Sequence, residues 1–106
     1  MIDLNEFVKT LEDNKLKNIS VYNLSNEDRY VVIASSMSAQ TSKAVSDLLK
    51  EKYDYSEKIE GYTKGEWIVF DFEKLTLHIF LPKVREKYNL DKLYKPMKLK
   101  LINSKK

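Results

Sequence analysis

The chain has 106 residues, with 19 basic and 16 acidic side chains, a formal net charge of +3 and no cysteine. This length predicts a single domain with a modest hydrophobic core. The lack of cysteine excludes disulfides and thiolate metal sites, and it fits a reducing compartment. No apolar run approaches the ~20 residues that a membrane-spanning helix needs, and the acidic first residues do not resemble a secretion signal. We therefore expect a soluble, cytoplasmic protein.

The positive charge is concentrated near the end of the chain. The basic residues are lysines except for Arg29 and Arg85. Specific nucleic-acid recognition usually uses more arginine, because the guanidinium group binds phosphate and guanine with two hydrogen bonds at once. Five lysines and no acid follow Tyr94. We expect a domain over residues 1–95 and a basic tail over 96–106, which aids solubility or contacts a phosphate backbone.

Hydrophobic spacing predicts the first three elements. Residues 3–15 place apolar side chains every three or four positions, as in an amphipathic helix. Asp3 is the expected N-cap of this helix, with Glu6 completing a capping box. Alternating apolar side chains over 19–24 predict a strand, and the apolar run within 29–35 predicts a second strand that is buried on both faces.

A second helix is predicted over about residues 39–52. Ser38 precedes it and is a suitable N-cap. The polar stretch that follows, 53–64, contains Gly61 and predicts a loop. The apolar stripe that should lie against the sheet consists of Ala44, Val45, Leu48 and Leu49.

Residues 65–94 are the most informative segment. Apolar strands over 66–72 and 75–81 are joined by a two-residue polar turn, so they must form an antiparallel hairpin. Pro82 opens a short charged helix, and the alternation after Pro96 suits an edge strand or a disordered end. This order predicts an α/β (α+β) fold with one mixed sheet of four to five strands and helices mainly on one face.

Side-chain alternation divides the hairpin into two faces. The set containing Ile68 and Phe70 is apolar and should face the helices. The other set combines large apolar side chains with an acid, a hydroxyl and an imidazole, which is typical of a protein interface. The expected partner-binding residues on this open face are Trp67, Val69, Asp71, Thr76, His78 and Phe80. Phe72 is expected to contribute at the hairpin tip if the turn is exposed.

Two possible reaction centres compete with this docking surface. Asp71 and Glu73 resemble the acid pair that holds magnesium in nucleotidyl transferases, and Ser35-Ser36 stands where those enzymes carry Gly-Ser. The third acid and the glycine that lets backbone approach a phosphate are missing. His78 could pair with Asp71, but no nucleophile accompanies them. We favour a protein that is not an enzyme and has no cofactor or metal; a divergent magnesium-dependent nucleotidyl transferase is the alternative.

Several ordered segments resemble the ribosomal silencing factor family, also called RsfS or iojap. In chain order they are Tyr30-Val-Val-Ile-Ala-Ser, Ser38-Ala-Gln, Asp47-Leu-Leu, Glu60-Gly61, Trp67-Ile-Val-Phe-Asp71, His78-Ile-Phe and the charged segment from Val84 to Tyr94. The chain departs from the family pattern at the end of the buried strand, in the hairpin turn and at the end of the last helix. These departures are Ser35-Ser36 for Thr-Gly, Glu73-Lys74 for Gly-Asp and Tyr94 for a tryptophan.

This resemblance implies a nucleotidyltransferase-like fold without the catalytic set. It also implies binding to the large ribosomal subunit through ribosomal protein L-fourteen, which sterically blocks subunit joining and represses translation. Asp71 would then pair with basic side chains of that partner. The resemblance further implies a possible homodimer, and the lysine tail would make at most a minor contact with ribosomal RNA. An RNA-binding ribosome-assembly accessory factor is a further alternative.

Overall fold

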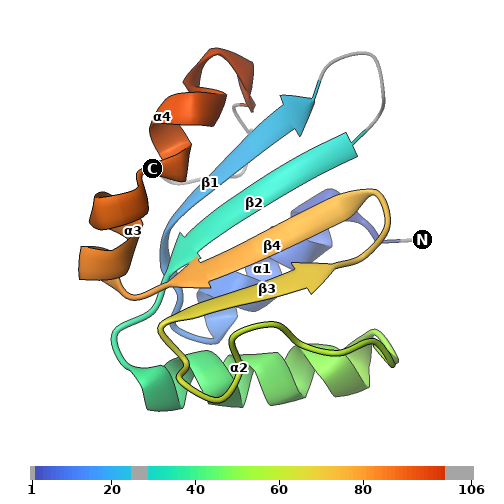
Figure 1. Ribbon diagram of the computed structural model, residues 1–106. Helices are drawn as coiled ribbons and strands as arrows, with labels where there is room; N and C mark the ends of the chain where they lie inside the picture. Colours follow the sequence, from blue (N-terminus) through green and yellow to red (C-terminus); the bar gives the residue numbers. More distant parts are fainter. Residues whose placement is uncertain (1, 25–28, 100–106) are drawn as a thin grey trace.

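The computed structural model describes residues 2–24 and 29–99 (Figure 1). The strands are β1 (Lys17–Leu24), β2 (Arg29–Ser35), β3 (Trp67–Asp71), β4 (Leu75–Phe80) and β5 (Lys98–Leu99). The helices are α1 (Leu4–Asp13), α2 (Ala39–Lys52), α3 (Pro82–Tyr88) and α4 (Leu90–Tyr94), and a short 3-10 turn, Lys95–Met97, follows α4.

The strands form one mixed sheet in the order β3-β4-β2-β1-β5, which confirms the predicted architecture. Strands β2 and β4 are parallel, and the other neighbouring pairs are antiparallel. Strand β5 adds the first part of the expected basic tail to the edge of the sheet beside β1. The rest of that tail, residues 100–106, lies outside the described residues.

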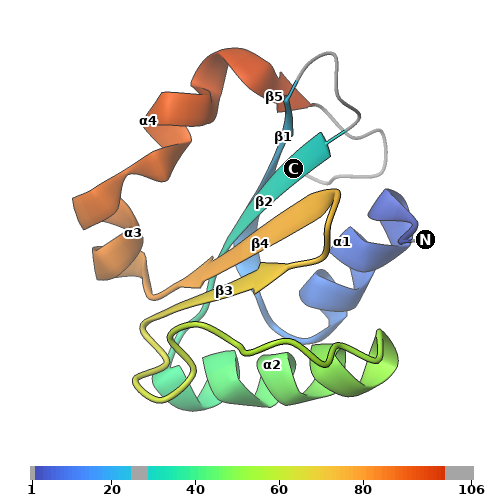
Figure 2. The same ribbon diagram turned by 45° about the vertical axis from the view of Figure 1, so that its right-hand side comes forward.

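Helices cover both faces of the sheet, but unequally (Figure 2). The longer helices α1 and α2 pack on one face, as predicted for helices mainly on one side. The short helices α3 and α4 lie against the other face, which the sequence pattern did not predict. Within the described ranges, no helix is long and apolar enough to cross a membrane.

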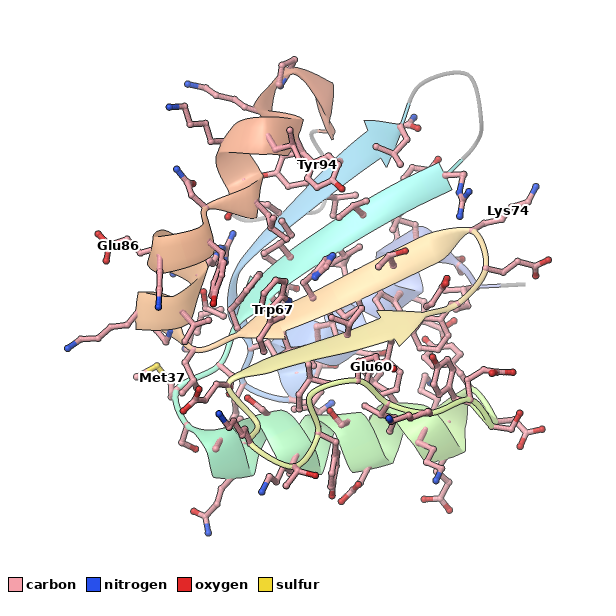
Figure 3. All side chains as sticks on the ribbon, viewed as in Figure 1. Met37, Glu60, Trp67, Lys74, Glu86 and Tyr94 are labelled. Atoms are coloured by element: carbon pink, nitrogen blue, oxygen red, sulfur yellow. The ribbon has the colours of Figure 1, made fainter. Side chains whose placement is uncertain are left out.

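A small apolar cluster lies between the sheet and α3–α4. Its buried members are Tyr22, Val31, Ile33 and Phe80. Trp67 from β3 and Tyr94 from α4 cover this cluster from two sides (Figure 3). Because these strand residues alternate with those of the main core, the sheet is buried on both faces at this end.

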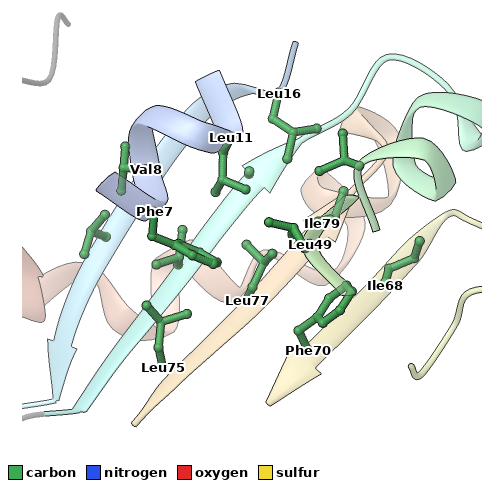
Figure 4. Packing of buried hydrophobic residues seen from close by; sticks show 14 of the residues in the cluster. Phe7, Val8, Leu11, Leu16, Leu49, Ile68, Phe70, Leu75, Leu77 and Ile79 are labelled. Carbon is green, nitrogen blue, oxygen red and sulfur yellow. The ribbon is translucent and has the colours of Figure 1, made fainter. Parts of the chain in front are cut away.

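The main core lies between the sheet and α1–α2 (Figure 4). Helix α1 contributes Phe7 and Leu11, and the hairpin contributes Ile68 and Phe70; all four are fully buried. The Asp3 carboxylate accepts hydrogen bonds from the first free backbone N–H groups of α1, so the predicted N-cap is confirmed.

The predicted buried stripe of α2 is partly wrong. Leu49 and Val45 are buried as expected, but Ala44 and Leu48 are exposed. Ser42 and Ser46 occupy the buried positions instead, and each hydroxyl donates to the backbone carbonyl four residues earlier, at 3.1 and 2.8 Å. This bonding satisfies the serine hydroxyls, so small polar side chains can lie in the close contact between α2 and the sheet.

The segment between α2 and β3 covers the outer edge of β3. The Val69 amide donates to the Glu60 carbonyl oxygen at 3.0 Å. Gly61 has φ of +79°, and a Cβ there would lie 1.9 Å from the Trp67 carbonyl oxygen. This close approach requires glycine. The covered edge is protected from pairing with other strands, so the hairpin presents its outer face rather than its edge.

Candidate protein-docking surface

The β3–β4 hairpin places the predicted partner-binding residues other than Phe72 on the face opposite α1 and α2. The register pairs Trp67 with Phe80, Val69 with His78 and Asp71 with Thr76 across the two strands. Ile68 and Phe70 point the other way and are fully buried in the core. The predicted parity of the hairpin is therefore confirmed, and it places the indole and the carboxylate on one surface.

Trp67 is the centre of an aromatic group on this surface. Its indole stacks on Phe80 with ring centroids 4.8 Å apart, and the Tyr88 ring from α3 lies 4.8 Å away on a tilted plane. The indole Nε1–H donates to Nδ1 of His78 at 3.0 Å. These contacts hold the half-buried Trp67 in one orientation. A fixed aromatic side chain loses little entropy on binding, which suits an interface anchor.

Burial favours the neutral form of His78. It lowers the pKa of His78, and the charge of Asp91 opposes this with a smaller effect. Since Nδ1 accepts the hydrogen bond from Trp67, the proton of the neutral ring is on Nε2. His78 therefore presents a hydrogen-bond donor rather than a charge. Its partner is Trp67, so the suggested pairing with Asp71 is not the arrangement found.

Phe80 does not lie open on this surface. Its side chain is fully buried beneath Trp67 and among the residues that α3 and α4 cover. The alternation predicted its face correctly, but the expected exposure is wrong because the two short helices close over that end of the sheet. Phe80 therefore supports Trp67 from below.

The remaining strand residues of the surface differ in exposure. Val69 and Thr76 are half-buried, and Asp71 is exposed. One oxygen of the Asp71 carboxylate accepts a hydrogen bond from the Glu73 amide at 3.1 Å, which leaves the second oxygen for a partner. Asp71 is thus the accessible negative charge of the strand face.

Phe72 lies on the other side of the hairpin. Its ring packs against Phe7, Tyr55 and Phe70 with centroids 5.1–5.6 Å apart. These are contacts of the main core, so the structure does not bring Phe72 together with Trp67 and Asp71.

The residues considered for a magnesium site are also separated. Asp71 pairs with Thr76, which lies beside Val31, four positions before Ser35 on β2. At ~3.3 Å per residue, roughly 13 Å along the sheet separates Asp71 from Ser35. Within the described part of the chain, no group of three His, Cys, Asp or Glu side chains could hold a metal ion. The serine turn and the acid pair therefore do not converge on one centre.

The sequence reasoning missed the polar group that fastens α3 and α4 to the sheet. The Arg85 guanidinium donates to both carboxylate oxygens of Asp91, at 2.8 and 3.0 Å, and to Ser35 Oγ at 2.8 Å. The Tyr22 hydroxyl donates to the same Asp91 carboxylate, and burial together with this bond raises the pKa of Tyr22 to about 12. One signal was available: Arg85 is one of only two arginines in a lysine-rich chain.

Comparison with known proteins identifies the family. The model of the family described as "Ribosomal silencing factor during starvation" matches residues 2–106. The chain belongs to the ribosomal silencing factor family. This is a family of ribosome-associated regulatory factors rather than of enzymes.

Similarities to individual proteins agree with this assignment. The chain is 30% identical over 92 residues to the ribosomal silencing factor RsfS of Zymomonas mobilis, covering 80% of this chain and 69% of that protein. It is also 30% identical over 102 residues to a Mus musculus protein named for mitochondrial assembly of the ribosomal large subunit. That match covers 87% of this chain but only 45% of the mouse protein.

A solved structure shows the same fold. A crystal structure of a Chromobacterium violaceum protein matches 97% of this chain and 95% of its own length, with a TM-score of 0.74 and 23% sequence identity.

Proposed function

We propose that this chain represses translation by binding the large ribosomal subunit and blocking its association with the small subunit. The contact would be with ribosomal protein L-fourteen on the face between the subunits, and the block would be steric. Family membership supports this proposal, and the name of the mouse relative refers to the large subunit. The protein would act in the cytoplasm, where ribosomes are assembled and used.

The observation that carries the proposal is the oriented aromatic and acidic surface of the hairpin. Trp67, braced by Phe80 and Tyr88, would be the apolar anchor. Asp71 would pair with a lysine or arginine of the partner through its free carboxylate oxygen. His78 would donate a hydrogen bond as a neutral ring. Such interfaces bury on the order of 800 Å² per partner and concentrate their energy in a few central side chains.

The test is co-sedimentation with purified large subunits in sucrose gradients. Trp67→Ala removes the anchor, and Asp71→Arg reverses the exposed charge. Loss of a central anchor typically costs ~2 kcal/mol or more, about a thirtyfold weaker complex. Lys9→Ala, on the exposed side of α1, is the matched control and should bind normally. Full co-sedimentation of both hairpin variants, with folded structure verified by circular dichroism, would contradict this surface assignment.

The block itself is tested by mixing the two subunits with the protein. Wild-type protein should shift the gradient profile from joined ribosomes towards free subunits, and the Trp67→Ala variant should not. A homodimer of the free chain stays a prediction, which sedimentation equilibrium can check.

A further inference from the structure

Helices α3 and α4, together with the turn that follows them, carry a net positive charge. Residues 82–96 contain five basic and two acidic side chains. Arg85 and Asp91 pair with each other, so they neutralise one another at the sheet. The exposed lysines that remain, here called the lysine ridge, are Lys83, Lys87, Lys92 and Lys95.

The ridge has little negative charge near it. None of its lysines forms an ion pair within the described residues. Glu86 is the exposed acid on α3, and it points outward from the helix (Figure 3). The helices on the other face of the sheet are different: α1 and α2 together carry four basic and five acidic side chains. The molecule is therefore polarised across the sheet, with an unneutralised positive side at α3–α4.

The ridge differs in charge from the docking surface beside it. Asp71 is exposed there, and Glu60 and Glu66 are exposed on the segment next to Trp67. A basic protein partner suits these acids but would be repelled by the ridge. The ridge therefore fits a second, negatively charged partner adjacent to the first.

We propose that the lysine ridge binds the phosphate backbone of ribosomal RNA beside the protein contact. This inference rests on the proposed function, since it places the RNA next to the docking surface on the same subunit. Exposed lysines are flexible point charges, which suit phosphate contacts that do not read sequence. Helix α3 rises about 10 Å over its 7 residues and α4 about 7 Å over its 5 residues, so the ridge is long enough to meet more than one phosphate.

Aromatic exposure supports RNA over an acidic peptide. Tyr88 is 50% exposed between Lys87 and Lys92, and the Lys87 ammonium lies 5.5 Å from its ring centroid. Trp67 covers part of the Tyr88 ring, and the exposed part remains open to a base beside lysines that can neutralise phosphates. An acidic peptide would use the charges but not the ring face.

The test compares two variants with the same change in net charge. The ridge variant replaces Lys83, Lys87, Lys92 and Lys95 by glutamine. The control variant replaces Lys9, Lys15, Lys50 and Lys52, which are exposed on α1, α2 and the turn after α1, by glutamine. If the ridge contacts four phosphates, a plot of the logarithm of affinity against the logarithm of salt concentration should have a slope of about −3.6. Wild-type affinity should then drop about a hundredfold between 50 and 200 mM salt.

Affinity is measured for purified large subunits, for deproteinised large-subunit RNA and for isolated ribosomal protein L-fourteen. The affinity of the ridge variant for large subunits should depend much less on salt concentration than that of the wild type. The ridge variant should also bind free RNA weakly, and the control variant should behave as the wild type. The control variant should bind L-fourteen with wild-type affinity, and the ridge variant should bind it at least as tightly, because the lysines that repel a basic partner are gone. If the two variants show equal salt slopes, or if poly-glutamate competes for the ridge better than RNA, the RNA assignment is overturned.

The outcomes separate this inference from the proposed function. If the ridge variant binds L-fourteen normally and binds large subunits like the wild type, RNA binding by the ridge is refuted and the proposed function stands. If RNA binding depends on the ridge but the protein does not bind L-fourteen, the proposed contact with L-fourteen is refuted and RNA binding by the ridge is supported.

Discussion

Replacing Arg85 by alanine is expected to destabilise the fold by about 3 kcal/mol. The guanidinium makes two hydrogen bonds to Asp91 at 2.8 and 3.0 Å, one to the Asn18 carbonyl at 2.6 Å and one to Ser35 Oγ at 2.8 Å. The side chains of Arg85 and Asp91 are only 14% and 26% exposed. Alanine at position 85 would remove the Arg85 positive charge from beside the largely buried Asp91 carboxylate.

The magnitude lies between two limits. A net hydrogen bond to a charged group contributes about 1.5–3 kcal/mol, and breaking a fully buried ion pair costs about 3–5 kcal/mol. Solvent reaches this pair in part and screens it, so about 3 kcal/mol is expected. With a urea slope of about 1.5 kcal/mol per molar, the unfolding midpoint should fall by about 2 M.

The assay is urea unfolding followed by circular dichroism and by Trp67 fluorescence. Fluorescence reports on α3 because Tyr88 packs against the indole. The matched control is Lys9→Ala, whose ion pair with Asp13 has side chains 73% and 61% exposed and should cost less than 0.5 kcal/mol. If Arg85→Ala costs no more than this control, the reasoning about the buried pair is refuted.

Two further predictions concern pH and backbone strain. Burial lowers the pKa of His78 below its ordinary 6.5. As the pH drops below about 6.5, the unfolded chain therefore takes up a proton at this ring more readily than the folded chain, and the free energy of unfolding should fall. The urea unfolding midpoint of the wild type should fall over this pH range, and that of His78→Gln should change less. Equal pH dependence of the two midpoints would contradict this prediction. Lys15 has φ of +75° just after α1, so Lys15→Gly should raise the free energy of unfolding by about 0.5–1 kcal/mol, measured by urea titration. Lys17→Gly, in a strand, should lower it; stabilisation by both would refute the strain argument.

Much of the fold could be predicted because its signals are local. The two-residue turn forces β3 and β4 into an antiparallel hairpin, and a period of two then decides that Ile68 and Trp67 face opposite sides. Asp3 and Ser38 cap their helices through bonds that span two or three residues. Each of these features depends on neighbours in the chain, so composition and spacing were enough.

Errors arose where distant segments meet. Alternation placed Phe80 on the outer face, but only the docking of α3 and α4 decides that it is buried there. The helical pattern of α2 favoured Leu48 for the core, yet the close contact with the sheet selects Ser42 and Ser46, whose hydroxyls bond to their own helix.

The sequence by itself determined the family, the mixed sheet and the shared face of Trp67 and Asp71. Tertiary structure alone decided the Arg85–Asp91 attachment to β2, which joins Arg85 to Ser35 across 50 positions of the chain. It also decided that Asp71 and Ser35 lie at opposite ends of the sheet, since that depends on strand order. Periodicity encodes which way a side chain points, whereas its neighbour across the fold depends on how all the elements pack together.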